Sequence, residues 1–497
     1  MTGKNDLIVI GAGIAGLATG CYARMNGYDV QIFEMHDKPG GMCTSWQRKG
    51  YTFDYCIHNL PGTAPGSGFR RIWDEIGALD GAAIVDHDEF VCVEDSSGRR
   101  FHWYSKLDRL EAHLKEIAPA DRGVADDLVG AARTFARADL FSMPLGGLRR
   151  TLRVLPSLPA VKRWSGTMMG EFAKRFSDGF MSRAWQHAQY DIPCAEVPMM
   201  APLMFMAGFE NGDLGCPVGG SLAFSRRIEQ RFLDLGGVIN YRSPVDKILV
   251  QNGRAVGIRL ADETEHHAGR VISAADGYGT IYTMLEGRYL TDWITKYYAN
   301  VWDVGPFGLV VYLGVDGSME HEPHALTLLL DDRIDLGEVT QDSLHISSFG
   351  PATGLAPEGK TVMKVEVQAS YPYWKKLRDD DQQAYRDKKA QIADTIVERI
   401  APRFPRLKER IEVVDVVTLP TSERYTGNRF GAQAAPPKEN AAAIQRKGLS
   451  QLLPGLDGFH HVGQWSNATI GVGNAALTGR SLLRALCKED GRQFRVG

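Results

Sequence analysis

The stretch LIVIGAGIAGLATG, at residues 7–20, constrains the fold more than any other part of the chain. A short apolar run, typical of a buried strand, leads into Gly11, Gly13 and Gly16 with GxGxxG spacing, and a helix-forming sequence follows. These glycines allow, in order, a tight turn, close approach of a pyrophosphate to the backbone, and close packing of the helix on a sheet. The next expected strand, DVQIFE, ends at Glu34, where a carboxylate can accept hydrogen bonds from an adenosine ribose. The stretch therefore predicts a dinucleotide-binding βαβ unit rather than a merely structural glycine turn.

Composition and charge exclude several classes of protein. The chain has 497 residues, enough for two or three domains, with 44% hydrophobic and 24% charged residues and a formal charge of −3. This charge gives no reason to expect a nucleic-acid partner, and no apolar run reaches the roughly 18–20 residues that span a bilayer. The polar start MTGKND does not resemble a signal peptide, and the seven cysteines form no CxxC pair. We therefore expect a reduced cytoplasmic protein without a structural zinc.

Segments of the nucleotide-binding type recur along the chain. They occupy residues 5–35, return at 215–282, and appear once more at 459–490. Amphipathic helical sequence fills about 105–200, and strand-like runs of an antiparallel kind fill 300–420, interrupted by the helical stretch DDDQQAYRDKKAQIADTIVERIAP. The nucleotide-binding domain is therefore expected to be discontinuous.

The segment after Glu34, EMHDKPGGMCTSWQRKGYTFDYCIHNLPG, indicates which dinucleotide binds. Through Asp37, the pair Gly40-Gly41 and the later Phe53-Asp54, it resembles the flavin-containing family of phytoene desaturases, carotenoid isomerases, retinol saturases and amine oxidases. NAD-dependent dehydrogenases do not place a glycine pair in this position. The resemblance therefore implies that the cofactor is FAD.

A second glycine-bearing turn, in GQWSNATIGVGNAALTGR at residues 463–480, resembles the closing motif of that family. The resemblance implies that the chain passes the cofactor at Gly463 and Gln464. It also implies that Gly471 and Val472, at the start of a helix, direct their N–H groups at the flavin pyrimidine, where a positive field stabilises the reduced ring.

The closing motif also departs from the family pattern. Many relatives have a proline and several consecutive glycines before this helix, whereas this chain has Ala468, Thr469 and Ile470.

A third match, SPVDKILVQNGRAVGIRLADE, implies that the backbone of Val245 meets the adenine, and RVISAADGYGT continues the family pattern with Asp276. The full set of expected cofactor-binding residues is Gly11, Gly13, Ile14, Ala15, Gly16, Glu34, Met35, Gly40, Gly41, Met42, Val245, Asp276, Gly463, Gln464, Gly471 and Val472.

The resemblance implies an α/β fold in which a Rossmann-like FAD-binding domain is combined with a substrate domain of mixed sheet and helices. We expect the FAD-binding domain to comprise residues 1–100, 215–285 and 450–497, and the substrate-binding domain, with its helical insertion, to comprise residues 101–214 and 286–449.

Candidate catalytic residues follow from the same resemblance. Cys56 and His58, in FDYCIHNL, follow the Phe-Asp pair and should approach the ring end of the flavin, where they can orient a substrate group or move a proton. Simple packing or hydrogen bonding is the alternative. Tyr425, in ERYTGNRFG, resembles part of a segment that lines the cavity in the family, together with Thr426, Gly427 and Asn428. Direct contact with substrate and a supporting position both remain open for this segment.

Two further segments have open interpretations. PMMAPLMFMAG, at 198–208, is rich in methionine, which suits either a cavity for an irregular apolar molecule or an ordinary core. Residues 140–170 combine basic side chains with leucines and have no acidic residue in the basic stretch, which suits either a membrane surface or a solvated helix pair. The histidine pairs at 266–267 and 460–461 lack converging ligands, so we predict no metal site.

The resemblance implies an FAD-dependent oxidoreductase that desaturates, saturates or isomerises carbon–carbon double bonds of a long hydrophobic polyene or isoprenoid-like substrate. The alternatives are a flavin amine oxidase and a flavin-fold binding protein for lipidated partners. Because the sequence has one complete GxGxxG unit and no second nucleotide fold for NADPH, we expect oxygen, a quinone or another protein as the electron partner, or no net redox change.

Overall fold

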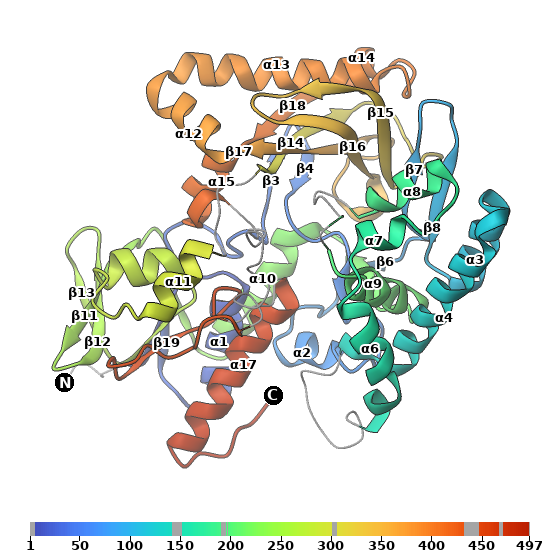
Figure 1. Ribbon diagram of the computed structural model, residues 1–497. Coiled ribbons are helices and arrows are strands. Elements are labelled where there is room, and N and C mark those ends of the chain that lie inside the picture. Colours follow the sequence, from blue (N-terminus) through green and yellow to red (C-terminus); the bar gives the residue numbers. More distant parts are fainter. Residues whose placement is uncertain are drawn as a thin grey trace.

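Two large sheets, each partly covered by helices, organise the molecule (Figure 1). The computed structural model describes residues 5–141, 152–189, 195, 197–300, 306–431, 447–466 and 471–496. The expected α/β fold, a Rossmann-like unit combined with a separate mixed sheet, is confirmed.

The first sheet has the strand order β10-β2-β1-β13-β12-β11, with β19 also paired to β13. Its strands are β1 (Asn5–Ile10), β2 (Val30–Phe33), β10 (Val238–Asn240), β11 (Val245–Gln251), β12 (Arg254–Leu260), β13 (Glu265–Ser273) and β19 (Phe459–His461). β1 lies between β2 and β13 and is parallel to both, while β11 and β12 form an antiparallel extension. Strands from the beginning, middle and end of the chain therefore meet in one sheet, as the recurring nucleotide-type segments predict.

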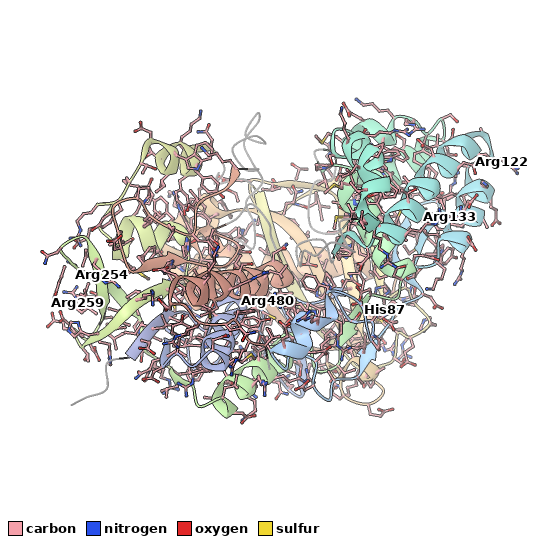
Figure 2. All side chains as sticks on the ribbon, turned by 90° about the horizontal axis from the view of Figure 1, so that it is seen from below. His87, Arg122, Arg133, Arg254, Arg259 and Arg480 are labelled. Atoms are coloured by element: carbon pink, nitrogen blue, oxygen red, sulfur yellow. The ribbon has the colours of Figure 1, made fainter. Side chains whose placement is uncertain are left out.

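One face of this sheet is covered by α1 (Ile14–Met25), α10 (Gly220–Asp234) and α17 (Val472–Glu489). The first and last of them are in close contact, because Gly479 of α17 lies against the side chain of Thr19 in α1. Figure 2 labels Arg480 of α17 near the middle of the molecule, with Arg254 and Arg259 of β12 at one end and Arg122 and Arg133 of α4 at the other.

The second sheet has the order β18-β14-β17-β16-β15-β7-β8. Its strands are β7 (Glu89–Glu94), β8 (Arg100–Tyr104), β14 (Pro306–Val315), β15 (Ala325–Asp335), β16 (Thr340–Phe349), β17 (Thr361–Ser370) and β18 (Ile411–Val417). The strands from 306 onward pair antiparallel as expected, while β7 joins β15 in parallel and makes the sheet mixed. One face packs its alternate apolar residues, including Met363, Val365 and Val367, under α12 (Tyr371–Asp380) and α13 (Gln382–Ile400).

A helical unit flanks the other end of the second sheet (Figure 1). Its helices are α3 (Leu107–Ile117), α4 (Arg122–Ala138), α6 (Leu158–Ser165), α7 (Met169–Ala173), α8 (Gly179–Gln186) and α9 (Met200–Glu210). They enclose a core with three buried tryptophans, Trp103, Trp164 and Trp185. Met199 and Met206 are buried in the same core, so the methionine-rich segment packs there as ordinary core sequence.

Smaller elements connect these parts. The remaining strands are β3 (Ser45–Arg48), β4 (Tyr51–Asp54), β5 (Leu60–Pro61), β6 (Ile84–Val85) and β9 (Leu214–Pro217). The remaining helices are α2 (Arg70–Glu75), α11 (Asp292–Asn300), α14 (Leu407–Arg410), α15 (Leu419–Thr426) and the short turns η1 (Pro119–Asp121), η3 (Leu155–Ser157), η5 (Gly279–Met284), η6 (Pro351–Thr353) and η7 (Arg429–Gly431).

The division into domains stays a proposal. Because β7 and β8 pair with the second sheet, we propose that the first piece of the nucleotide-binding domain ends before Glu89 rather than at residue 100.

Candidate functional site

A cavity of about 340 Å³ lies at the carboxyl ends of β1 and β2, where the glycine-rich turn enters α1. Most of the residues expected to bind the cofactor line it, although they come from widely separated segments. These are Gly11, Gly13, Ile14, Ala15, Glu34, Met35, Gly40, Gly41, Met42, Val245, Gly463, Gln464, Gly471 and Val472. The beginning, middle and end of the chain therefore enclose one cavity.

Two helices begin at this cavity. α1 starts after Gly13 and α17 starts after Gly471, and neither helix has a side chain that caps its N-terminus. The first N–H groups of a helix have no partner within the helix, and its dipole favours negative charge at this end. The two N-termini therefore suit an anionic or electron-rich ligand such as a pyrophosphate or a flavin pyrimidine.

Glu34 is the acidic residue of the cavity. Its Oε2 accepts a hydrogen bond from the Ala12 N–H at 2.7 Å, and its Oε1 accepts one from the His36 N–H at 2.8 Å. Burial raises the pKa of this carboxyl group, and the N–H groups of His36 and Ala12 oppose the rise. These bonds tie the end of β2 to the glycine-rich turn and leave each carboxylate oxygen further capacity to accept hydrogen bonds from a ribose.

The pair Gly40-Gly41 lies over the glycine-rich turn. The Gly40 N–H donates to the Ala12 carbonyl at 2.9 Å, and Gly40 also forms an isolated bridge with Gly13. Gly40 has φ +111°, and a Cβ there would overlap the Cys43 carbonyl. Only glycine allows this approach, which brings the second turn to the wall of the cavity.

Two predicted binding residues lie behind the cavity wall. A Cβ at Gly16 would overlap the Gly11 carbonyl oxygen, so this glycine sets how closely α1 approaches the turn. Asp276 is buried, and its carboxylate accepts the N–H groups of Gly279 at 2.7 Å and Arg429 at 3.2 Å. Burial raises the pKa of Asp276 to about 6. Its neighbours Ala274 and Ala275 line the cavity instead.

The candidate catalytic residues separate in space. Cys56 lines the cavity, whereas the half-buried His58 is not part of the lining and has its Nε2 3.3 Å from the Nζ of Lys364. Burial and then the charge of Lys364 hold the pKa of His58 well below its ordinary value, so its imidazole is neutral at pH 7. Tyr425 is 48% exposed, with its ring 5.3 Å from the ring of His36, and it does not line the cavity.

The loop that carries Cys56 and His58 is anchored by a buried carboxylate. Asp54 accepts hydrogen bonds from the backbone N–H of Ser221 at 2.7 Å and from its hydroxyl at 2.8 Å, at the N-terminus of α10. The Ser221 hydroxyl in turn accepts the Ile57 N–H at 2.8 Å. Burial raises the pKa of Asp54 to about 6. The Phe-Asp pair of the sequence motif therefore positions this loop.

Several lining residues were not among the predicted binding residues. They are Ile10, Phe33, Cys43, Pro244, Ala274, Ala275, Met284, Thr426, Asn428, Trp465 and Ala475. Most are sequence neighbours of predicted residues, so extending each motif by one position would have found them. Thr426 and Asn428 belong to the segment that the sequence placed at the cavity, and Asn428 contacts the sulfur of Met42 at 2.7 Å.

A buried ion pair behind Cys56 was also missed. Lys364 and Glu366, on β17, lie 2.8 Å apart with side chains 1% and 7% exposed. The Lys364 Nζ also donates to the Tyr55 carbonyl at 3.4 Å. Alternating charged residues in TVMKVEVQAS were the only signal, and such a pattern equally describes a solvent-facing strand.

Known proteins share both the first motif and most of the chain's length. A family of NAD(P)-binding Rossmann-like domains matches residues 9–76, which confirms the dinucleotide-binding unit. A chloroplastic prolycopene isomerase of Daucus carota is 24% identical, covering 95% of this chain and 78% of the isomerase. An all-trans-retinol 13,14-reductase of Danio rerio is 23% identical, covering 88% and 79%. A neurosporene-forming phytoene desaturase of Rhodobacter capsulatus is 26% identical over 64% of this chain and 61% of the desaturase.

This chain is a distant relative of carotenoid isomerases, phytoene desaturases and retinol reductases. The resemblance inferred from the motifs is thereby confirmed.

Solved structures share the fold at lower identity. An oxidoreductase from Methanosarcina mazei superposes with a TM-score of 0.61 at 17% identity, covering 96% of this chain and 100% of the other. Cyclohexylamine oxidase from Brevibacterium oxydans gives a TM-score of 0.60 at 13% identity, covering 98% and 100%. Within the described ranges, no helix is long and apolar enough to cross a membrane. The same ranges contain no cluster of three or more His, Cys, Asp or Glu residues arranged to hold a metal ion.

Proposed function

We propose that the cavity between α1 and α17 binds FAD, without a covalent link. The proposal is supported by two uncapped helix N-termini, the close approach that Gly40 allows, and the buried carboxylate of Glu34 at the end of β2. No cysteine or histidine lies in a recognised attachment motif of the sequence. Acid precipitation should therefore release free FAD into the supernatant, and yellow colour that stays with the pellet would contradict a non-covalent site.

We propose that the protein is an FAD-dependent oxidoreductase that acts on carbon–carbon double bonds of an isoprenoid-like substrate. The observation that carries this proposal is the relationship, over most of the chain, to isomerases, reductases and desaturases whose names refer to carotenoids and retinol. Amine oxidases share the fold at 13–14% identity, which supports the architecture and not the amine as substrate.

When bound, FAD would supply a ring that accepts or donates a hydride. The residues of this chain would orient the substrate beside that ring and exclude water. Cys56 forms part of the cavity wall. The neutral imidazole of His58 lies outside this lining, where it can form a hydrogen bond. Because its pKa is lowered, the His58 imidazole is a weak base and has no second ring proton to donate at pH 7, so it can orient a substrate group by hydrogen bonding. We propose no catalytic role for Tyr425, because it lies outside the cavity lining.

The sequence bears on which molecule would exchange electrons with the flavin. Because only one complete GxGxxG unit is present, we propose oxygen or a quinone as the partner if the reaction has a net redox change.

We also propose reversible contact with an anionic membrane near residues 152–165. Leu152, Leu155 and Leu158 are exposed there at 56%, 49% and 48%. Trp164 is buried and Arg163 pairs with Asp127 at 2.6 Å, so neither residue adds to the exposed basic and apolar surface that the sequence suggested for this segment. The rest of the basic segment, residues 142–151, lies outside the described residues.

The test of the reaction class is an anaerobic stopped-flow comparison of oxidised and reduced enzyme with polyenes and with primary amines. We expect a polyene, and no amine, to change the flavin spectrum or to emerge altered in double-bond number or geometry. His58→Ala should lower that rate more than it lowers FAD content. Bleaching by amines with no response to any polyene would overturn the proposal.

A further inference from the structure

Two cysteines share the wall of the cavity between α1 and α17. Cys43 and Cys56 both line it, and both are free thiols in this structure. None of the other cysteines that the structure describes lines this cavity; they are Cys21, Cys92, Cys216 and Cys487. Two neighbouring thiols can be oxidised together to a disulfide and so hold or release two electrons. The pair therefore adds a second redox-competent group to the wall of the proposed flavin site.

The hairpin of β3 and β4 brings the two cysteines opposite each other. Its strands pair antiparallel from the turn back to the first residue of β3. One step further, the Tyr55 N–H donates to the Thr44 carbonyl at 3.1 Å and continues the same register. The next pair in this register is Cys43 with Cys56. Opposite residues of antiparallel strands have Cα atoms about 4.5–5.5 Å apart, which lies within the roughly 4.4–6.8 Å that a disulfide spans.

The start of α10 holds both sides of the cysteine pair. The Cys43 thiol donates to the Ser221 carbonyl at 3.6 Å, and the Ile57 N–H, next to Cys56, donates to the Ser221 hydroxyl at 2.8 Å. The Cys43 carbonyl also accepts a hydrogen bond from the Ser225 hydroxyl at 2.7 Å. Because one helix contacts both segments, the two cysteines are fixed relative to each other and not only to their own strands.

The surroundings of the pair limit attack from solvent. Cys43 is 3% exposed, and Cys56 is half-buried. Burial, and then the neighbouring Cys56 thiol, raise the pKa of Cys43 well above its ordinary value, so Cys43 is protonated at pH 7. Because a thiolate and not a thiol is the nucleophile, oxidants in bulk solvent should react slowly at this residue. An electron acceptor bound in the cavity, by contrast, would share it with both cysteines.

We propose that Cys43 and Cys56 are a redox-active pair that exchanges two electrons with FAD. On oxidation of the pair, two S–H bonds break and one S–S bond forms, while two electrons and two protons pass to FAD. Oxygen or a quinone then takes these electrons and protons from the reduced flavin. In the reverse direction, the disulfide takes up two electrons and two protons from reduced FAD and becomes two thiols again. This inference rests on the proposed function, because the exchange needs FAD in the cavity.

The experiment measures the disulfide and the electrons separately. The holoenzyme is equilibrated anaerobically in glutathione buffers of graded potential and quenched with acid, and its free thiols are then alkylated in denaturant and mapped by mass spectrometry. In parallel, air-oxidised holoenzyme is titrated anaerobically with dithionite while the flavin absorbance is followed. The variants are Cys56→Ser and Cys43→Ser, whose hydroxyl can still donate to the Ser221 carbonyl. Cys92→Ser, on β7 of the second sheet, is the control.

We expect Cys43 and Cys56 to lose alkylation together as the buffer becomes more oxidising, with their two peptides joined. The wild type and Cys92→Ser should consume about twice as much dithionite per FAD as Cys43→Ser or Cys56→Ser, because a disulfide and a flavin each take up two electrons.

Three results would overturn this inference and leave the proposed function standing. The first is the absence of a joined peptide at every potential, and the second is equal consumption of dithionite by the wild type and Cys43→Ser. The third is a bond from Cys56 to Cys216, a competing thiol whose sulfur lies 4.0 Å from the Ile57 carbonyl oxygen. If the purified protein bound no FAD, the proposed function and the electron exchange would fall together.

Discussion

Arg480, on the last helix, donates two hydrogen bonds to Glu75 of α2, from Nε at 2.7 Å and from Nη2 at 3.0 Å. The two side chains are 14% and 7% exposed, and the Tyr22 hydroxyl of α1 donates to the same carboxylate at 2.8 Å. This partly buried contact joins the first and last helices of the nucleotide-binding sheet through α2. It holds α17, and with it the second helix N-terminus, against the cavity.

Glu75→Gln should therefore destabilise the protein by about 3–5 kcal/mol, because it leaves the Arg480 guanidinium without its carboxylate. The midpoint of urea unfolding at pH 7 measures this change. Asp74→Asn is the matched control: Asp74 is 56% exposed and pairs with Arg70 on the surface, so it should cost under about 1 kcal/mol. Equal shifts for the two variants would contradict the buried role.

The same pair should respond to acid. Burial raises the pKa of Glu75, but hydrogen bonds from Arg480 and Tyr22 outweigh it, so the pKa is lowered overall from 4.5. The contribution of Glu75 to stability is therefore present above about pH 4.5 and is lost as the pH falls below that value. The stability difference between the wild type and Glu75→Gln should shrink below pH 4.5 and stay constant above pH 6.

Glu34→Gln should weaken FAD binding by about ten- to a hundredfold, because the ribose hydroxyls lose a charged acceptor worth about 1.5–3 kcal/mol. The amide keeps the shape of the side chain and leaves one of the Ala12 and His36 N–H groups without an acceptor, because its NH2 group can only donate, whereas Glu34→Ala would leave both without one. Fluorescence titration of the apoprotein with FAD measures the dissociation constant. Glu265→Gln, on an exposed position of β13, is the control. An unchanged dissociation constant for Glu34→Gln would remove this residue from the site.

His345 should make the protein acid-sensitive. Its pKa is lowered from 6.5 to about 3, so the unfolded chain binds a proton at this residue between these values and the folded chain does not. The stabilising effect of a neutral His345 is complete above about pH 6.5 and is lost progressively as the pH falls from there. Relative to His345→Gln, the wild type should lose about 1.4 kcal/mol of stability per pH unit below pH 6.5.

Chemical unfolding of both proteins at pH 7, 6 and 5 measures the change attributed to His345. Taking the difference between them cancels the opposite contributions of Asp54 and Asp276, whose pKa values are raised to about 6. The same substitution at His267, exposed on β13, should show no comparable trend. A constant difference between the wild type and His345→Gln would show that the His345 imidazole is not held neutral.

Replacing Leu152, Leu155 and Leu158 together with Ser should abolish sedimentation with anionic liposomes and leave FAD content unchanged. Binding of the wild type should fall as salt rises, because exposed charges are screened within about 10 Å at 0.1 M ionic strength. Leu233→Ser, at an exposed leucine of α10, is the control for a general loss of apolar surface. Equal recovery of wild type in the supernatant with and without anionic lipid would rule out the membrane contact.

The parts of the site that were predictable from sequence are those in which the backbone conformation requires a particular residue type. Gly13, Gly40 and Gly471 lie at the cavity because only glycine permits the required turns and close approaches, and such positions appear in the sequence as spaced glycines. The strands of the second sheet from residue 306 onward were predictable for a similar reason, since their alternating or continuous apolar runs have the period of a buried strand, whereas the membership of β7 and β8 in this sheet was not predicted.

The parts that were not predictable depend on tertiary proximity. Lys364 and Glu366 meet His58 only because β17 crosses behind the loop at residues 54–58, and no local pattern encodes that crossing. Tyr425 was expected at the cavity from its motif, yet its neighbours Thr426 and Asn428 face inward and the tyrosine lies beside His36. The altered turn at Ala468, Thr469 and Ile470 lies outside the described residues.

The walls of the cavity between α1 and α17 include Gly11 and Ala475, which lie far apart in the sequence. During synthesis, α17 leaves the ribosome long after α1, so both helix N-termini can face the same ligand only once α17 has emerged. The early βαβ unit can fold while translation continues, but it has only half of a binding site until α17 is added. Because a ligand stabilises only the state that binds it, cofactor should accumulate on chains that include α17 and not on shorter nascent chains. A bound cofactor would thus mark a chain whose α17 has been translated.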